Sequence, residues 1–315
     1  ALAYLNPARY RLNLTVRANV AARRILFDGR RAIGVEVTSQ GETFRVEGEE
    51  IVLCAGAIGS PHLLMLSGVG PADELRAVGI EPIHDLPGVG ENLRDHPLIM
   101  VMFAVKGGLP DPFGPLMQAG LRFTASGSDL RNDLQLNPLC VAGARGSFLT
   151  DAPDDVAGFG IVVALEQARG AGKITLAAPD PDVQPTVHFR YLADPWDRER
   201  LREGVRLLVR LAKYPAFGEI VEGRIRPTDD QLTSDEALDA WLRERVSTQH
   251  HASGTCKMGP GADPLAVVDQ HCRAHGLEGL RVVDASVMPN VPRANTNATT
   301  IMIAERVADW IRQGR

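Results

Sequence analysis

The stretch that decides the fold is Ile51-Val52-Leu53-Cys54-Ala55-Gly56-Ala57-Ile58-Gly59-Ser60-Pro61. Its first residues are apolar without alternation, which is typical of a strand buried on both faces. Small residues at 55–57 let the backbone pass close to another group. Ser60 and Pro61 have the residue types of a helix N-cap and of a first helical position. The stretch therefore predicts a strand, a Gly-rich turn and a helix beginning at Pro61, either beside a nucleotide-binding crevice or as an ordinary strand-to-helix crossing.

Short segments rich in β-branched residues lie on the N-terminal side of this stretch. They predict strands at residues 12–16, 21–27, 32–38, 43–46 and 50–54. Asp28-Gly29 is a strong signal for a tight hairpin, and Gln40-Gly41 is a weaker one. Hairpin-connected strands are therefore expected to lead into the strand–turn–helix unit.

The middle of the chain has short strand-like segments between Gly- and Pro-rich loops, which indicates a second, mainly antiparallel unit. Its strands are predicted at residues 98–105, 133–139, 159–165, 173–176 and 184–189. Its helices are predicted at residues 194–212 and 235–245. Beyond it, residues 280–283 predict a buried strand. A C-terminal helix carries one apolar stripe, formed by Ile301, Ala304, Val307, Ala308 and Ile311.

Length and composition limit the possible classes of protein. A chain of 315 residues exceeds the usual single core, and contents of 44% hydrophobic and 23% charged residues are typical of a globular protein. A net charge of −5 without long Lys/Arg runs argues against a nucleic-acid partner. No apolar stretch reaches the ~18 residues that a membrane span needs. Four cysteines without framework spacing indicate free thiols, which predicts a cytoplasmic protein.

Residues 246–315 gather imidazoles, amides, small residues and a helix N-terminus. The segments are His250-His251-Ala252-Ser253-Gly254-Thr255-Cys256-Lys257-Met258-Gly259, Asp284-Ala285-Ser286 and Asn295-Thr296-Asn297-Ala298-Thr299. A neutral imidazole is suited to accept a proton near pH 7, and a carboxamide can donate a hydrogen bond to a developing alkoxide. An active site for an uncharged or anionic ligand needs such groups.

These segments resemble the C-terminal signature of the glucose–methanol–choline (GMC) flavoprotein oxidoreductases. Residues 56–71 closely resemble that family's second signature, and residues 88–96 and 172–176 match further stretches. The resemblance covers most of the chain and is weakest over about 107–165. It implies an α/β, Rossmann-like FAD-binding domain, incomplete here, formed by residues 1–96 and 246–315. An α+β substrate-binding domain, built on a mainly antiparallel sheet, is expected to interrupt it at residues 97–245.

The resemblance also implies roles for single residues. It implies FAD-dependent oxidation of a small-molecule alcohol to a carbonyl, with His251 as the base that takes the hydroxyl proton while hydride moves to the flavin. Asn295 falls on the family's second catalytic position. No metal ligand is implied. The implied cofactor-binding residues are Val20, Ala55 and Gly56 near the adenine end, Asp284 and Ala285 along the ribityl–pyrophosphate portion, and Asn297 and Thr299 near the pyrimidine edge.

One element of the family has no match in this sequence. The family's first signature, a strand followed by Gly-x-Gly-x-x-Gly and a helix, cradles the FAD pyrophosphate. Gly68-Val69-Gly70 and Gly88-Val89-Gly90 both lack the third glycine and lie outside a first βα unit. The chain is therefore expected to be the C-terminal portion of such an enzyme. An N-terminal FAD-binding segment is expected upstream or on a separate chain.

Three other interpretations stay open on the sequence alone. A zinc site is one, although the spacing fits no common zinc module; its candidate ligands are His250, His251, Cys256, His271, Cys272 and His275. A cysteine-based hydrolase that uses Cys256 beside His251 is another, although no third group is recognisable. A non-catalytic fragment that binds a partner chain is the third. In addition, Asn295 has an alternative role as a cap of the last helix, and His250 either lines the pocket or fills space.

Overall fold

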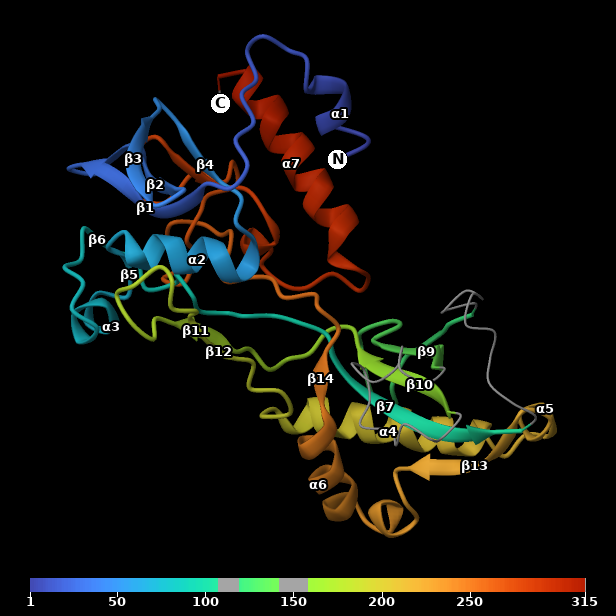
Figure 1. The fold of residues 1–315 in the computed structure, drawn as a ribbon. Helices are drawn as coiled ribbons and strands as arrows, with labels where there is room; N and C mark the ends of the chain where they lie inside the picture. The colour runs from blue at the N-terminus through green and yellow to red at the C-terminus, as the bar shows by residue number, and fades with distance from the viewer. Residues whose placement is uncertain (107–118, 142–157, 315) are drawn as a thin grey trace.

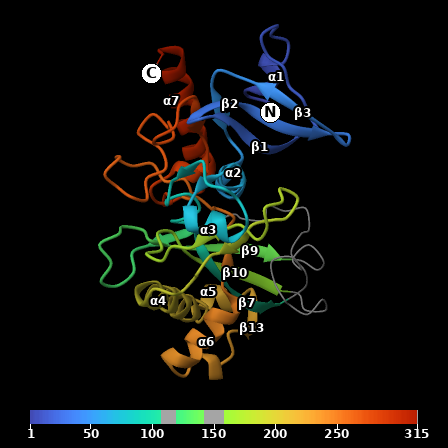
Figure 2. The same cartoon turned by 90° about the vertical axis from the view of Figure 1, so that its left-hand side faces the viewer.

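The computed structural model describes residues 1–106, 119–141 and 158–314. Two large apolar cores lie within these residues, at opposite ends of the molecule in Figures 1 and 2, and Leu139, Val162 and Ala164 form a third, small cluster. The first core includes residues from both ends of the chain, and the second lies between a sheet and two helices. Within the described ranges, no helix is long and apolar enough to cross a bilayer.

The N-terminal part forms a three-stranded antiparallel sheet after the short helix α1 (Leu5–Ala8). Its strands follow one another in the order β1 (Ala21–Asp28), β2 (Arg31–Ser39) and β3 (Glu42–Glu47). The hairpin predicted at Asp28-Gly29 is confirmed, with Gly29 at a positive φ of 57°. The strand predicted at residues 12–16 is wrong, because the backbone N–H of Leu14 donates to Arg11 in a turn (3.1 Å).

The stretch that decides the fold forms a parallel strand pair and a helix. Strand β4 (Ile51–Leu53) pairs in parallel with β15 (Leu280–Val282), so segments from the two ends of the chain lie side by side. The helix α2 (Gly56–Leu66) follows β4 directly. Among the described residues, Val52 on β4 stays 42% exposed, so the prediction of a strand buried on both faces is wrong here.

Helix α2 begins at Gly56, five residues before the predicted start. Pro61 therefore lies inside the helix, where it has no N–H to donate to the carbonyl of Ala57. The hydroxyl of Thr255 donates to that carbonyl instead (2.6 Å). The prediction failed because a residue almost 200 positions away satisfies the group that Pro61 leaves open.

Several short elements complete this part of the molecule. They are β5 (Val69–Gly70) paired in parallel with β6 (His84–Asp85), α3 (Ala72–Ala77), the hairpin of β11 (Lys173–Thr175) and β12 (Thr186–His188), and η3 (Ala285–Val287). Ile174 on β11 packs in the first core although it lies within the predicted range 97–245. The three domain boundaries given above stay predictions.

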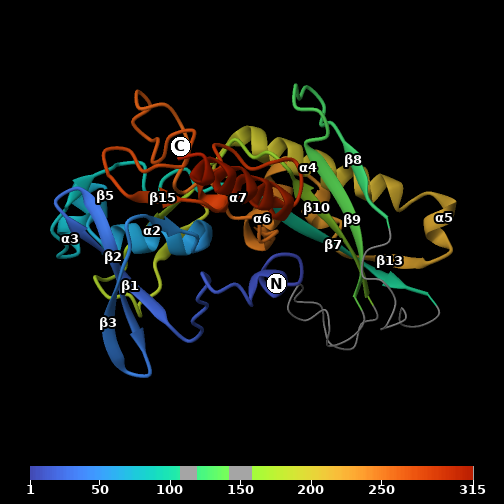
Figure 3. The same cartoon turned by 90° about the horizontal axis from the view of Figure 1, so that it is seen from above.

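The second core confirms the mainly antiparallel sheet that the middle of the chain predicts. The strand order is β13 (Val221–Arg226), β7 (Pro97–Val105), β10 (Gly158–Leu165), β9 (Leu134–Val141) and β8 (Leu121–Phe123), and β14 (Ser247–Thr248) pairs with the start of β7. Helix α4 (Pro195–Leu211) packs on one face through Leu201, Val205 and Leu208. Helix α6 (Asp235–Arg245) matches its predicted range, and α5 (Pro215–Gly218) and η2 (Asp230–Leu232) are short. In Figure 3 this sheet lies on the right and α2 on the left, with α7 (Thr296–Arg312) between them in that view.

The predicted apolar stripe of α7 is largely exposed. Val307 is its only buried residue among those described, whereas Ile301 and Ile311 are 40% and 36% exposed. The packed side of the helix shares only Val307 with this stripe and presents Ile303, Val307 and Trp310 to the first core. The helix therefore leaves an apolar face uncovered by the described residues.

Candidate active site

His251 lies in the loop after β14, between Val246, which packs against the second core, and Ala252, which packs against the first. His250 adopts a positive φ of 64°, and its backbone N–H donates to the hydroxyl of Thr248 (2.8 Å). This bend leaves the His250 side chain exposed and turns His251 inward, where it is partly buried. The backbone therefore distinguishes the two neighbouring imidazoles.

Asp95 holds this loop in place. Its carboxylate, 5% exposed, accepts hydrogen bonds from the backbone N–H groups of His251 (3.0 Å) and His96 (2.7 Å). The hydroxyls of Tyr191 (2.5 Å) and Thr248 donate to its second oxygen. Burial and this carboxylate raise the pKa of the Tyr191 hydroxyl. Four donors from three segments thus converge on one carboxylate, which fixes the position of the His251 backbone.

Both ring nitrogens of His251 have a side-chain partner. Nδ1 lies 2.9 Å from Nδ1 of His96, whose ring meets the His251 ring edge-on. Nε2 lies 3.0 Å from the amide nitrogen Nδ2 of Asn295. Asn295 stands at the N-cap position of α7 but makes no side-chain capping bond. Its amide therefore contacts the imidazole rather than the helix end, and the two predicted catalytic residues lie together.

The surroundings of His251 favour the neutral imidazole. Burial lowers its pKa below the usual value of 6.5, the charge of Asp95 opposes this, and His250 adds a smaller lowering. Burial and the neighbouring His251 lower the pKa of His96 to about 4. At pH 7 both imidazole rings are consequently neutral, and His251 can accept a proton.

Four of the predicted cofactor-binding residues lie together at the start of α2. The carboxylate of Asp284 accepts from the Gly56 N–H (2.9 Å), the Ser60 hydroxyl (2.5 Å) and the Ser286 N–H (2.7 Å). The Ser60 oxygen in turn accepts from the Ala55 N–H (3.0 Å). Gly56 has a positive φ of 82°, and a Cβ there would meet no atom within 4 Å. The Asp284 side chain thus ties this turn to β15, while the space in front of Gly56 is open.

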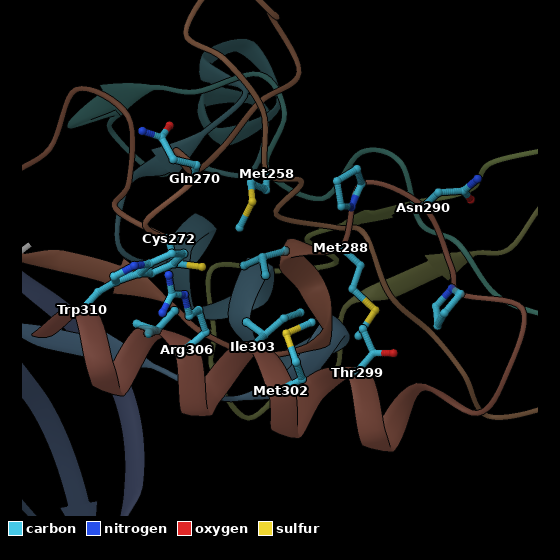
Figure 4. Close-up of a pocket in the computed structure, with 14 residues that line it drawn as sticks. Met258, Gln270, Cys272, Met288, Asn290, Thr299, Met302, Ile303, Arg306 and Trp310 are labelled. Carbon is cyan, nitrogen blue, oxygen red and sulfur yellow. The ribbon is translucent and has the colours of Figure 1, made fainter.

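The other three predicted cofactor residues lie elsewhere. Asn297 is exposed in the first turn of α7, close in sequence to Asn295. Thr299 lines a cavity of about 310 Å³ between α7 and the loops that precede it (Figure 4). Met258, Met288, Met302 and Ile303 point into this cavity, which is therefore apolar. Val20 lies immediately before β1, away from the imidazole pair, beside Asn19, whose carbonyl accepts from Ser39 (2.9 Å).

The structure disfavours a thiol or metal centre in the predicted His/Cys patch. Burial raises the pKa of the Cys256 thiol, which is fully buried, and raises that of Cys272 to about 12. Neither thiol is therefore ionised near pH 7. The rings of His271 and His275 are directed to Trp310 and to the carbonyl of Gly259. Among the described residues, no group of three or more His, Cys, Asp or Glu side chains could hold a metal ion.

Sequence reasoning missed the residues behind His251. Asp95 and His96 lie in the segment 88–96, which was matched to the family without a role for either side chain. The available signal was one acidic and one basic residue, Asp95 and His96, directly before an apolar strand. Tyr191 and Thr248 carried no such signal, because their contacts to Asp95 join segments far apart in sequence.

Comparison with known proteins agrees with this architecture. Two models for the family GMC oxidoreductase match residues 1–98 and 168–304. An oxygen-dependent choline dehydrogenase from Photobacterium profundum is 37% identical over 333 residues, which cover 98% of this chain and 58% of that protein. A second, from Serratia proteamaculans, is 38% identical over 340 residues, covering 99% and 60%. The chain thus spans about three fifths of the length of these relatives.

Solved structures give the same result. Pyridoxine 4-oxidase from Mesorbium loti superposes with a TM-score of 0.89 at 28% identity, covering 98% of this chain and 60% of that one. A formate oxidase from Aspergillus oryzae superposes with a TM-score of 0.86 at 26% identity, covering 98% and 62%. The fold places the chain in the same structural class as these two oxidases. Within that class, the chain belongs to the GMC oxidoreductase family.

Proposed function

We propose that this chain carries the catalytic residues of an FAD-dependent oxidoreductase that converts an alcohol to a carbonyl compound. The observation that carries the proposal is the pair formed by His251 Nε2 and the Asn295 amide, 3.0 Å apart. The lowered pKa of His251 keeps this imidazole ready to accept a proton. The names of the relatives, choline dehydrogenase and pyridoxine 4-oxidase, support oxidation of a CH–OH group.

Each residue of the pair has one role in this proposal. His251 takes the hydroxyl proton at Nε2, and the Asn295 amide donates a hydrogen bond to the oxygen as negative charge develops on it. FAD, when bound, supplies the acceptor for the hydride that leaves the carbinol carbon. Asp95 keeps His251 in position, because it accepts from the backbone of the same residue. Small-molecule alcohols are the proposed substrate class.

The described residues fit part of a flavin. The first turn of α7 has no side-chain cap, so its backbone N–H groups and the exposed Asn297 can face an anionic acceptor. Thr299 follows on the same helix. The open turn at Ala55 and Gly56, with Asp284 and Ala285 beside it, leaves room for an extended part of the cofactor. Val20 is proposed near the adenine on the resemblance alone. These residues would hold FAD.

We propose in addition that residues outside 1–315 supply the Gly-x-Gly-x-x-Gly turn for the pyrophosphate, from the same chain or another one. Two surfaces support this. One is the exposed apolar face of α7 with Ile301 and Ile311, and the other is Val52 on a parallel sheet of two strands. Both surfaces are suited to a further strand and helix. Residues 1–315 alone should lose FAD on desalting, and a stable flavin spectrum would contradict this.

The activity test uses the FAD-loaded protein that contains this chain. A panel of uncharged, cationic and anionic alcohols is mixed with it without oxygen, and loss of the oxidised flavin absorbance is recorded. A redox dye and oxygen are then compared as electron acceptors. Reduction by at least one alcohol, with formation of the matching carbonyl compound, is the expected result. If no alcohol reduces a fully loaded flavin, the proposed function is wrong.

A cytoplasmic location is the final part of the proposal. Cys54, Cys256 and Cys272 are all free thiols in the structure, as expected in a reducing compartment. Fractionation of cells that express the protein, with marker enzymes for each compartment, tests it. Recovery in an oxidising compartment would contradict the proposal.

A further inference from the structure

The side chain of His96 is fully buried between His251 and the loop before α7. Its Nε2 lies 2.8 Å from the backbone carbonyl of Pro292, and its Nδ1 lies 2.9 Å from Nδ1 of His251. A carbonyl oxygen only accepts hydrogen bonds, so Nε2 of His96 must carry a proton. Because a neutral imidazole carries one proton, the Nδ1 of His96 is then a bare acceptor.

This arrangement decides where the proton of His251 lies. Two bare nitrogens 2.9 Å apart would repel each other, so the hydrogen between the rings belongs to Nδ1 of His251. Nε2 of a neutral His251 then carries no proton and keeps its lone pair. That lone pair faces the Asn295 amide, which donates to it (3.0 Å). The chain of donors runs from Asn295 and His251 through His96 to Pro292.

We propose that His96 is a positioning residue for the reaction: it holds His251 in the tautomer that carries its proton on Nδ1 and presents Nε2 as the base. This inference rests on the proposed function for its consequence in catalysis, but the tautomer itself is a property of the protein at rest. Without the Nδ1 acceptor of His96, the neutral His251 ring can carry its proton on Nε2 instead. Nε2 then has no lone pair with which to act as the base.

The surroundings of His96 keep this acceptor in place. Its backbone N–H donates to Asp95, which also binds the backbone of His251. The loop that offers the Pro292 carbonyl is held to the sheet unit by Gln167, whose amide donates to the Val291 carbonyl (3.4 Å). Asp95 and Gln167 therefore hold the two ends of the hydrogen-bonded chain that His251 and His96 form, and neither residue is part of that chain.

A buried carboxyl lies at the inner end of the chain. Glu166, 1% exposed, has a carboxyl oxygen 3.9 Å from Nε2 of His96, and neither of its oxygens has a hydrogen-bond partner among the described residues. Burial raises its pKa, which the charge of Arg122 opposes. When the alcohol O–H bond breaks and the N–H bond forms at Nε2, His251 becomes an imidazolium. Its charge is shared through Nδ1–H with His96, and Glu166 faces that ring from behind.

The test compares two substitutions of His96 in the FAD-loaded protein. His96→Asn places a carboxamide oxygen near the position of Nδ1 and keeps an acceptor, whereas His96→Leu removes it. His84→Asn is the matched control, because His84 also bonds a backbone carbonyl, that of His275 (3.0 Å), away from the imidazole pair. Nitrogen-15 NMR of the histidine rings, with the His251 signals identified by their loss in His251→Asn, reports the tautomer without turnover.

We expect the unsubstituted protein and His96→Asn to show a neutral His251 protonated at Nδ1, and His96→Leu to lose that preference. Flavin reduction by alcohol should slow by about tenfold to a hundredfold in His96→Leu, part of the ~10²–10⁴-fold that a general base contributes. It should recover most of that loss in His96→Asn. The pH profile should shift only in His96→Leu, while Asp95, His250 and Glu166, the other charged or titratable groups facing the pair, stay the same.

Two results overturn the inference. One is an Nε2-protonated His251 in the unsubstituted protein. The other is the finding that His251 has the same tautomer in His96→Leu, in His96→Asn and in the His84→Asn control. If His96→Leu does not fold, the tautomer of His251 in the unsubstituted protein still tests the inference, because a proton on Nε2 contradicts it. A protein that shows the expected tautomer but oxidises no alcohol contradicts the proposed function and leaves the inference on His96 standing.

Discussion

The sheet unit around α4 and the loops around His251 differ in what holds them together. In the sheet unit, Leu201, Val205 and Leu208 pack on a continuous apolar sheet face, and the main polar contribution is the buried Arg200. Around His251, the segments have little regular structure and are held by carboxylates that accept from backbone N–H groups, above all Asp95 and Asp284. A site that is held through its backbone N–H groups leaves side chains such as that of His251 available for the reaction.

The two regions are therefore expected to tolerate substitutions differently. An apolar face stabilises through many small contacts, so the apolar packing of the sheet unit, apart from its buried Arg200, depends on pattern more than on any one residue. A carboxylate that accepts three or four hydrogen bonds concentrates the same stability in one side chain. The following predictions, from the largest effect to the smallest, test this difference.

The largest effect on stability should come from the buried polar cluster around Arg200 in the sheet unit. Arg200, 1% exposed, pairs with Asp133 (3.0 Å) and Asp197 (2.8 Å), both nearly fully buried. Arg200→Met leaves two buried carboxylates without their cation and should lower the free energy of unfolding by about 3–5 kcal/mol. Arg206→Met on the same helix, with its half-exposed partner Asp235, should cost about 0–1 kcal/mol. Urea unfolding measures both, and equal effects would contradict the prediction.

Asp284 should give the next largest effect. Asp284→Ala removes the acceptor of Gly56, Ser60 and Ser286, and should lower stability by about 1.5–3 kcal/mol, the range for hydrogen bonds to a charged group. Hydrogen exchange should accelerate at Gly56 and Ser286 but not in α4. If exchange increases equally in both regions, the carboxylate does not act locally and the comparison fails.

The pH dependence of stability should report the titration of His96. Its pKa is about 4 in the folded protein and 6.5 in its ordinary state, so unfolding takes up a proton between these values. The stability from burying the neutral ring is complete above pH 6.5 and is lost as the pH falls toward 4. Thermal unfolding from pH 4 to 7 should be flatter for His96→Asn than for the unsubstituted protein. An unchanged slope would show that His96 does not titrate in this range.

The smallest effect on activity is expected at Cys256. Its buried thiol has a raised pKa and is not needed for proton or hydride transfer. Cys256→Ser should leave the rate of flavin reduction unchanged and cost about 1–3 kcal/mol of stability, because it buries a hydroxyl. Loss of turnover with a normal flavin content would instead favour a nucleophilic cysteine.

The sequence predicted the sheet unit better than the site. Strands β7, β9 and β10 and helix α6 follow from apolar periodicity, which depends on neighbouring residues only. The pair of His251 and Asn295 was predicted from motif order, and the structure places the two side chains 3.0 Å apart.

Features that depend on distant residues were missed. Helix α2 includes Pro61 because Thr255 satisfies the carbonyl of Ala57, and no local pattern contains that information. The packed side of α7 could not be predicted for the same reason, since the apolar stripe does not say which side meets the first core. His96 was missed because its contact with His251 joins positions 155 residues apart.

The most direct test of the central claim is anaerobic stopped-flow reduction of the flavin by an alcohol substrate, in His251→Ala and His250→Ala. If His251 is the base, His251→Ala should slow reduction by about 10²–10⁴-fold, with the loss shrinking at high pH, and reoxidation should be unaffected. His250, which is exposed, should be replaceable with little effect. Reduction at the unsubstituted rate in His251→Ala, or a large loss in His250→Ala alone, would contradict the account.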